Sequence, residues 1–363
     1  MTRDAPDSPV KNEFGICSVS LGDGKYHSLE KKLRAAADAG FTIIDLFDGC
    51  WAAYLVENGV DPSTMWDATE ENLRLATQLG DMIRNFGMTM SCVQPLRCIE
   101  GVLDPVERRK TLDAVAQWFP FMRAMQTDML FMCANVRGDD GVTSDLDIVA
   151  ADLAELGDMA AAFAAKDGGP MIKVGYEALS WAQRNLWIQS WEVVEKANRP
   201  NVGMILDTFN MLAVEYADPY NPAGHGRKHD TEEQAIKAIK DSMSTLVKRV
   251  TPEKIFFVQI ADAELVDPAK FHPPADPSIP RILPWSRGYR LYPMEQHRGG
   301  YMPVTAVLAA ILATGYTGPL GLEVFNRTLL VDDSSVPDSH AKRGFSGLAK
   351  LVAEASRMEP YWT

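Results

Sequence analysis

Four oxygen-bearing side chains stand at or near the ends of short apolar runs in the second half of the sequence. Three are carboxylates, Glu177, Asp207 and Glu323, and the fourth is the amide of Gln259. Three carboxylates that met at one point would repel and raise one another's pKa values, and a divalent cation between them removes that cost. Because all four groups are oxygen ligands without a thiolate, they predict a site for Mn²⁺ or Mg²⁺ rather than Zn²⁺.

A single carboxylate at the end of an apolar run is more often a helix cap or a surface ion pair than a metal ligand. Four such residues at the ends of four successive runs favour the metal site, because helix caps have no reason to occur at the same position of consecutive strands. A site with three negative charges and one divalent cation keeps some negative charge, which suits the removal of a proton nearby.

The elements that would position these residues alternate regularly along the chain. Eight short β-branched or apolar runs occur at residues 16–21, 41–47, 88–94, 128–134, 171–177, 202–207, 255–260 and 319–324. Longer segments with helical periodicity lie between or after them, at 29–39, 66–86, 105–125, 144–165, 183–197, 231–250, 303–314 and about 340–357. Eight strand-then-helix units predict an α/β fold, a single (β/α)8 TIM barrel.

The order of the runs also predicts where the site lies. Two long connections, 210–230 after the sixth strand and 261–301 after the seventh, follow the carboxyl ends of strands, where barrel enzymes place their active sites. The glycines after the first run, Gly22 and Gly24, lack the third glycine of a dinucleotide-binding fingerprint, so an open Rossmann sheet is disfavoured. We expect a disordered tail at residues 1–13 and one catalytic domain at 14–363.

Composition excludes several classes of function. The chain has 363 residues, 46% of them hydrophobic and 23% charged, which is typical of a soluble globular protein. Its net charge of −13 disfavours nucleic acid as a partner. No apolar run approaches the ~20 residues of a membrane helix. The five cysteines are scattered, which predicts reduced thiols and a cytoplasmic protein.

Several short motifs, in this order along the chain, carry a resemblance to known enzymes. Residues 176–181 (YEALSW), 206–210 (LDTFN) and 322–326 (LEVFN) resemble the xylose isomerase-like superfamily of sugar phosphate isomerases and epimerases. More narrowly, residues 94–97 (QPLR), 100–101, 133–136 (CANV) and 286–290 (SRGYR), with Gln259 where many relatives have a histidine ligand, are similar to the 3-dehydroshikimate dehydratase family of quinate and shikimate catabolism.

The resemblance implies a carbon–oxygen lyase. It implies that a divalent metal assists the dehydration of 3-dehydroshikimate to protocatechuate, by abstraction of the proton α to the carbonyl and elimination of the β-hydroxyl as water. In that mechanism Glu177 and Glu323 are the candidates for the catalytic base, and Glu177 is preferred. It also implies that Arg97 and Arg290 bind the substrate's carboxylate and that Ser286 adds a hydroxyl donor.

One position departs from the family. The motif after the sixth strand often ends in histidine, expected at the substrate, whereas this chain has Asn210, whose amide can donate a hydrogen bond but cannot shuttle a proton. Either a loop histidine such as His225, His229 or His297 replaces it, or the carboxylates suffice, or the substrate differs.

Two other functions remain open from the sequence. One is a ketose or sugar epimerase or isomerase on the same metal-binding barrel, although a neutral sugar needs no arginine pair. The other is a barrel that has lost catalysis and binds a metabolite as a regulator, which would not require the complete ligand set. In all of these cases the expected partner is a small molecule, and a homo-oligomer is possible.

Overall fold

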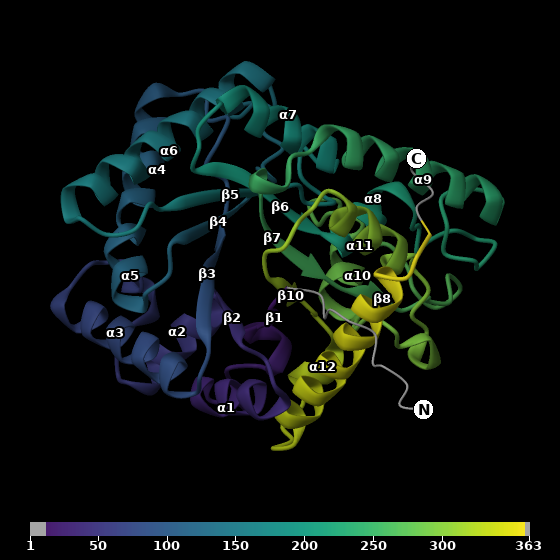
Figure 1. Cartoon of the computed structure of the whole chain (residues 1–363), viewed down its shortest axis with the longest axis horizontal. Helices are drawn as coiled ribbons and strands as arrows, with labels where there is room; N and C mark the ends of the chain where they lie inside the picture. Colours follow the sequence, from purple (N-terminus) through teal and green to yellow (C-terminus); the bar gives the residue numbers. More distant parts are fainter. Residues whose placement is uncertain (1–11, 360–363) are drawn as a thin grey trace, which may run out of the picture.

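Eight parallel strands pair edge to edge and close on themselves in a computed structural model that describes residues 12–359 (Figure 1). Their order around the barrel is β1–β10–β7–β6–β5–β4–β3–β2. The strands are β1 (Phe14–Cys17), β2 (Ile43–Phe47), β3 (Thr89–Leu96), β4 (Met129–Cys133), β5 (Lys173–Glu177), β6 (Val202–Asp207), β7 (Ile255–Ile260) and β10 (Leu320–Leu322). The predicted α/β class and TIM barrel are therefore confirmed.

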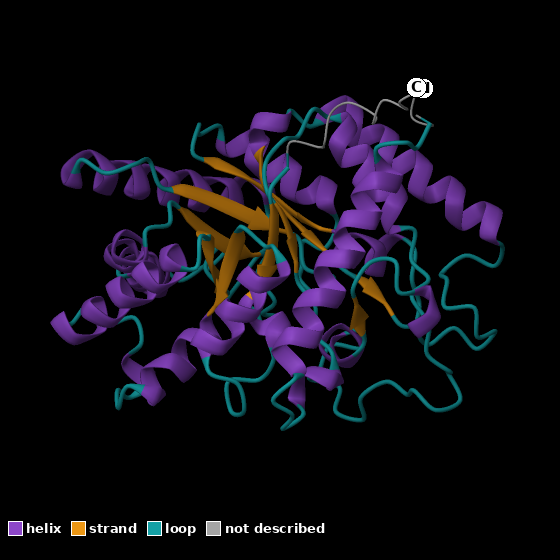
Figure 2. Cartoon of the chain, turned by 60° about the horizontal axis from the view of Figure 1, so that its bottom comes forward, coloured by secondary structure: helices purple, strands orange, loops and turns teal. Residues whose placement is uncertain are grey.

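Helices surround the strands on all sides (Figure 2). Within residues 12–359 they are α1 (Leu29–Ala39), α2 (Asp48–Glu57), α3 (Glu70–Asn85), α4 (Pro105–Ala116), α5 (Trp118–Met125), α6 (Leu146–Asp167), α7 (Trp187–Ala197), α8 (Thr208–Glu215), α9 (Glu232–Arg249), α10 (Leu283–Gly288), α11 (Val304–Ala313) and α12 (Val336–Ala355). The predicted segment 29–39 coincides with α1, because Ser28 caps its first turn and Gly40, at φ 104°, ends it.

The first strand is shorter than the apolar run that predicted it. β1 ends at Cys17, and a 3-10 helix, Ser18–Leu21, follows where the run 16–21 continued. The buried Ser18 hydroxyl accepts a hydrogen bond from the backbone N–H of Phe47, and the Ser20 hydroxyl accepts one from that of Val324. These two bonds tie the turn to the ends of the neighbouring strands, which an apolar pattern cannot reveal.

The helices α2, α8 and α10 were not expected from the sequence. Each is short, with ten, eight and six residues, and none shows a long amphipathic period. The predicted helix at 105–125 is two helices, α4 and α5, which meet at Gln117. The most consequential of these differences is α8, because it begins directly after β6 and so carries Asn210 into the barrel mouth.

The two long connections are more ordered than their composition suggested. The first six residues of 210–230 belong to α8, so that connection is shorter than predicted. The connection 261–301 contains α10 and a small antiparallel pair, β8 (Asp262–Ala263) with β9 (Arg290–Leu291). This pair returns Arg290 to the carboxyl end of the barrel.

Other expectations meet the structure only in part. Within residues 12–359, no helix is long and apolar enough to cross a membrane. All five cysteines are free thiols, and four of them are buried. The predicted tail 1–13 lies outside the described residues except for its last two, of which Asn12 is buried and donates a hydrogen bond to the carbonyl of Gly318. A homo-oligomer stays a prediction.

A buried carboxyl at the end of α8 makes stability depend on pH. Burial raises the pKa of Glu215 to about 7, although the Ser242 hydroxyl donates to it and Lys228 lies nearby. Between its unfolded-state pKa and pH 7 the folded protein therefore binds more protons at this site than the unfolded chain. The contribution of Glu215 to the free energy of unfolding therefore falls as the pH rises through that range.

We expect Glu215→Gln to be more stable than the wild type at about pH 8, by up to about 3 kcal/mol, with little difference at about pH 5. Thermal unfolding followed by circular dichroism at both pH values measures the difference. Glu354→Gln, at an exposed position on α12, is the matched control and should show no such pH-dependent gain. An equal effect of Glu215→Gln at both pH values would contradict the assignment.

Candidate active site

The four side chains singled out from the sequence lie at one end of the barrel. Glu177 and Asp207 are the last residues of β5 and β6. Gln259 is the penultimate residue of β7, and Glu323 follows β10 directly. These strands are consecutive neighbours, in the order β10–β7–β6–β5. All four residues are buried, so solvent screens the charges of the three carboxylates only weakly.

Two donors join the three carboxylates into one cluster. The Nδ2 of Asn210 donates to Glu177 Oε1 at 2.9 Å and to Asp207 Oδ2 at 3.0 Å. The Nη1 of Arg290 donates to Asp207 Oδ2 at 2.7 Å and to Glu323 Oε2 at 3.1 Å. Asp207 is thus the central member, and the cluster holds three acidic groups against one guanidinium.

Asp207 is a helix cap as well as a member of the cluster. Its Oδ1 accepts hydrogen bonds from the backbone N–H groups of Phe209 and Asn210, at 2.6 and 3.1 Å, and so caps α8. Its Oδ2 faces Asn210 and Arg290. From the sequence, a helix cap and a metal ligand were alternative roles for such a carboxylate. In the structure Asp207 can serve both, because Oδ1 caps the helix and Oδ2 faces the cluster.

Gln259 presents an amide oxygen that no donor satisfies. Its Nε2 lies 3.5 Å from Asp45 Oδ2, a carboxylate oxygen that also accepts from Gln94. Its Oε1 is buried without a hydrogen-bond partner in the described part of the chain. An unsatisfied buried acceptor costs about 1–3 kcal/mol. This oxygen is therefore available to coordinate a hard cation.

The electrostatics of the cluster favour a bound proton or cation. Burial, followed by the charges of Asp207 and Glu323, raises the pKa of Glu177 well above its usual value. Burial also raises the pKa of Glu323, although Arg290 opposes the shift. Hard oxygen donors in an acidic, enclosed cluster are the chemistry that binds Mg²⁺ or Mn²⁺.

The cluster is not prearranged around one point. Among residues 12–359, no three His, Cys, Asp or Glu side chains stand as ligands of a common metal ion. Arg290 lies between Asp207 and Glu323, and Asn210 lies between Glu177 and Asp207. The donor set has the chemistry of a cation site. In this structure the guanidinium of Arg290 supplies the positive charge beside two of its carboxylates.

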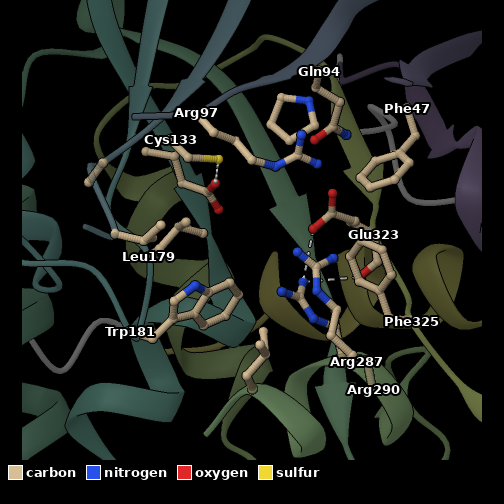
Figure 3. A pocket seen from close by; sticks show the side chains of 15 residues that line it. Phe47, Gln94, Arg97, Cys133, Leu179, Trp181, Arg287, Arg290, Glu323 and Phe325 are labelled. Atoms are coloured by element: carbon tan, nitrogen blue, oxygen red, sulfur yellow. Dashed lines mark hydrogen bonds and ion pairs between the residues drawn. The ribbon is translucent and has the colours of Figure 1, made fainter. Parts of the chain in front are cut away.

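A cavity of about 250 Å³ opens above the cluster (Figure 3). Glu177 and Glu323 line it, whereas Asp207 and Gln259 lie beneath. Its other walls are mostly apolar, aromatic or basic. They are formed by Phe47, Gln94, Pro95, Arg97, Cys133, Ala134, Val136, Leu179, Trp181, Leu283, Arg287, Arg290 and Phe325. Such a space suits a small ring that carries negative charge.

Comparison with known proteins shows the family of this chain. A family model described as "Xylose isomerase-like TIM barrel" matches residues 33–351. The chain is 34% identical over 352 residues to a 3-dehydroshikimate dehydratase of Neurospora crassa, covering 95% of both chains. The chain belongs to the xylose isomerase-like TIM barrel family. It is also a homologue of 3-dehydroshikimate dehydratase.

Other members of the family differ in length or only share the fold. A 3-dehydroshikimate dehydratase of Pseudomonas putida is 31% identical over 312 residues, and the chain spans 38% of its length. A fusion of a xylose isomerase-like barrel with 4-hydroxyphenylpyruvate dioxygenase superposes with a TM-score of 0.66, at 29% identity over 96% of this chain and 45% of that one. IolI, solved with a zinc atom, superposes with a TM-score of 0.64 at 14% identity, covering 95% of this chain and all of its own.

Of the substrate-binding residues expected from the family resemblance, Arg97 and Arg290 line the cavity. Arg97 lies at the rim with 43% of its side chain exposed, and its Nη1 donates to Asp48 at 2.6 Å. Ser286 is fully buried and does not line the cavity. Its Oγ lies 3.4 Å from Arg290 Nη2, so it supports the arginine.

Asn210 also lies beneath the cavity rather than in its wall. Its amide nitrogen links Glu177 and Asp207, and its oxygen accepts from the N–H and hydroxyl of Ser180. No histidine of residues 12–359 lines the cavity, so the suggested replacement by His225, His229 or His297 gains no support. In this family member the position holds the carboxylates in place.

Cys133 and Arg287 are two of the lining residues to which the sequence assigned no role. The Sγ of Cys133 donates to Glu177 Oε2 at 3.2 Å, whereas the sequence offered Cys133 only as part of the motif 133–136. Arg287 belongs to the quoted motif 286–290, but only the two ends of that motif were assigned a role. Its position in the cavity wall depends on α10, which has no periodic signal in the sequence.

Proposed function

We propose that this chain dehydrates 3-dehydroshikimate to protocatechuate and water. The observation that carries the proposal is the buried carboxylate cluster of Glu177, Asp207 and Glu323 beneath a cavity with arginines in its wall. The similarity to the 3-dehydroshikimate dehydratase of Neurospora crassa, which extends over 95% of both chains, supports it. A neutral sugar does not require arginines in the wall, which disfavours an epimerase.

A divalent cation, which we infer to be Mn²⁺ or Mg²⁺ held by Glu177, Asp207, Gln259 and Glu323, would supply a Lewis acid beside the substrate's carbonyl. We infer that Glu177 is the base. Its carboxylate lines the cavity and has no arginine on it, whereas Glu323 accepts from Arg290.

The reaction then needs few further groups from the chain. Glu177 takes the proton α to the carbonyl, and the electron pair of that C–H bond forms the new double bond as the β-hydroxyl leaves. The leaving hydroxyl takes up the proton that Glu177 accepted and departs as water. Transfer of a further ring C–H proton to the carbonyl oxygen then gives the aromatic product. Asn210 holds Glu177 in position from below. Phe47, Trp181 and Phe325 exclude water from the ring.

A direct assay tests the function. Purified protein with 3-dehydroshikimate and Mn²⁺ or Mg²⁺ should produce the near-ultraviolet absorbance of a catechol acid. A chelator should abolish the signal, and excess metal should restore it, because the carboxylate cluster requires a cation to polarise the carbonyl. Absence of product with either freshly added metal would contradict the proposal and favour the epimerase or isomerase function instead.

A further inference from the structure

The arginines in the cavity wall differ in what they already bind. Arg290 donates to Asp207 and Glu323, two carboxylates of the cluster. Arg97 is paired with Asp48 at the rim. Their charges are therefore compensated by the protein itself, and neither guanidinium is free to give its whole donor fork to a ligand.

Arg287 is different. Within residues 12–359 its guanidinium has no hydrogen bond and no ion pair, although the side chain stands in the cavity wall and is reached by solvent there. Enclosure by the surrounding protein lowers the pKa of this group, while Glu323 opposes the shift. An arginine stays charged even so. The cavity wall thus contains one positive charge without a counter-ion in the described part of the chain.

Two aromatic rings hold this guanidinium. Its central carbon lies 4.1 Å from the ring centroid of Phe325 and 5.6 Å from that of Trp181. Figure 3 shows Arg287 beside Arg290, with Trp181 and Phe325 to either side. Contact with aromatic faces stabilises a guanidinium but leaves its N–H donors unused. The group is oriented before any ligand arrives.

We propose that Arg287 receives the carboxylate of the substrate and selects a carboxylate-bearing ring over a neutral one. The inference rests on the proposed function. A carboxylate is the anion that satisfies a planar guanidinium with two parallel hydrogen bonds. This assignment differs from the sequence-based one, in which Arg97 and Arg290 share that role, because both of those arginines already have acidic partners.

A purely structural role for Arg287 makes a different prediction. The side chain could fasten α10 to Phe325 through the cation–π contact alone. Its loss would then weaken the binding of acidic and neutral ligands equally. The test must therefore compare two ligands that differ in the carboxylate.

The experiment uses Arg287→Gln, Arg287→Lys and the control Arg281→Gln in the full chain. Arg281 lies in the same connection and stacks on Tyr220 at 4.6 Å, but it does not line the cavity. Steady-state assays give KM and kcat for 3-dehydroshikimate. Calorimetric titration gives the affinities for protocatechuate and 4-methylcatechol, which differ in the carboxylate but share the two hydroxyls.

We expect Arg287→Gln to raise KM about 10- to 100-fold with a smaller change in kcat, the size of a lost charged hydrogen-bond pair. The preference for protocatechuate over 4-methylcatechol should disappear in the same variant. Arg287→Lys should recover part of both, because it keeps the charge but loses the fork. Arg281→Gln should behave as the wild type.

Two results would overturn the inference: an unchanged preference for the acid in Arg287→Gln, or an equal loss of affinity for both ligands. A wild-type protein that does not turn over 3-dehydroshikimate would instead overturn the proposed function. The ratio of the two ligand affinities would still decide whether Arg287 binds a carboxylate. The two failures are therefore distinguishable.

Discussion

Glu323→Gln is expected to lower kcat/KM by about 10²–10³-fold, because the change removes one of three negative charges in the cluster while keeping its shape. The affinity for Mn²⁺ should fall by at least about tenfold, since an amide oxygen is a weaker ligand for a hard cation than a carboxylate. The absorbance assay measures the first effect, and calorimetric titration with Mn²⁺ measures the second.

The matched control is Glu264→Gln. Glu264 belongs to the connection after β7 and pairs with Arg327 at 2.8 Å, but it does not line the cavity. Its replacement should leave both turnover and metal affinity within about twofold of the wild type, as for other partly exposed ion pairs. If Glu323→Gln also stayed near the wild-type values, the carboxylate cluster would not be the catalytic centre.

Glu177→Gln is expected to lower kcat by about 10²–10⁴-fold, because the amide cannot accept the α-proton. KM should change little, since the arginines and aromatic rings of the wall are untouched. Steady-state kinetics separate the two parameters. Glu215→Gln, which neutralises a buried carboxyl outside the cavity, is the control and should retain full turnover.

The two glutamate variants together identify the base. If Glu177→Gln kept most of its kcat while Glu323→Gln lost it without losing Mn²⁺ affinity, the roles assigned here would be exchanged. Loss of metal affinity in both variants, with the larger fall in kcat for Glu177→Gln, is the pattern expected when both residues are ligands and Glu177 also moves the proton.

Much of the barrel is predictable because its strands are buried on both sides. The runs 202–207 and 255–260 coincide with β6 and β7, since continuous apolar stretches of that length fit a parallel sheet. A polar residue that ends such a run must lie at the barrel mouth. For this reason Glu177, Asp207, Gln259 and Glu323 could be placed on neighbouring strands without coordinates.

The pairing of side chains could not be predicted in the same way. Arg290 reaches Asp207 across 83 positions, and Arg97 reaches Asp48 across 49. The first pairing depends on α8, α10 and the β8–β9 pair, and the second on α2, which begins at Asp48. The short sequences of these elements carry no periodic signal. The sequence therefore indicated that arginines belong to the site but not which of them is free to meet a ligand.

The junction between β6 and α8 has a consequence for how this enzyme can diverge. No residue intervenes between Asp207, which ends the strand, and Thr208, which begins the helix. An insertion there would separate the cap from its helix and displace a buried acid at the same time. New substrate preferences in descendants of this chain should therefore arise through changes in the parts of the connection 261–301 outside residues 286–290, because Arg290 itself is bonded to Asp207 and Glu323.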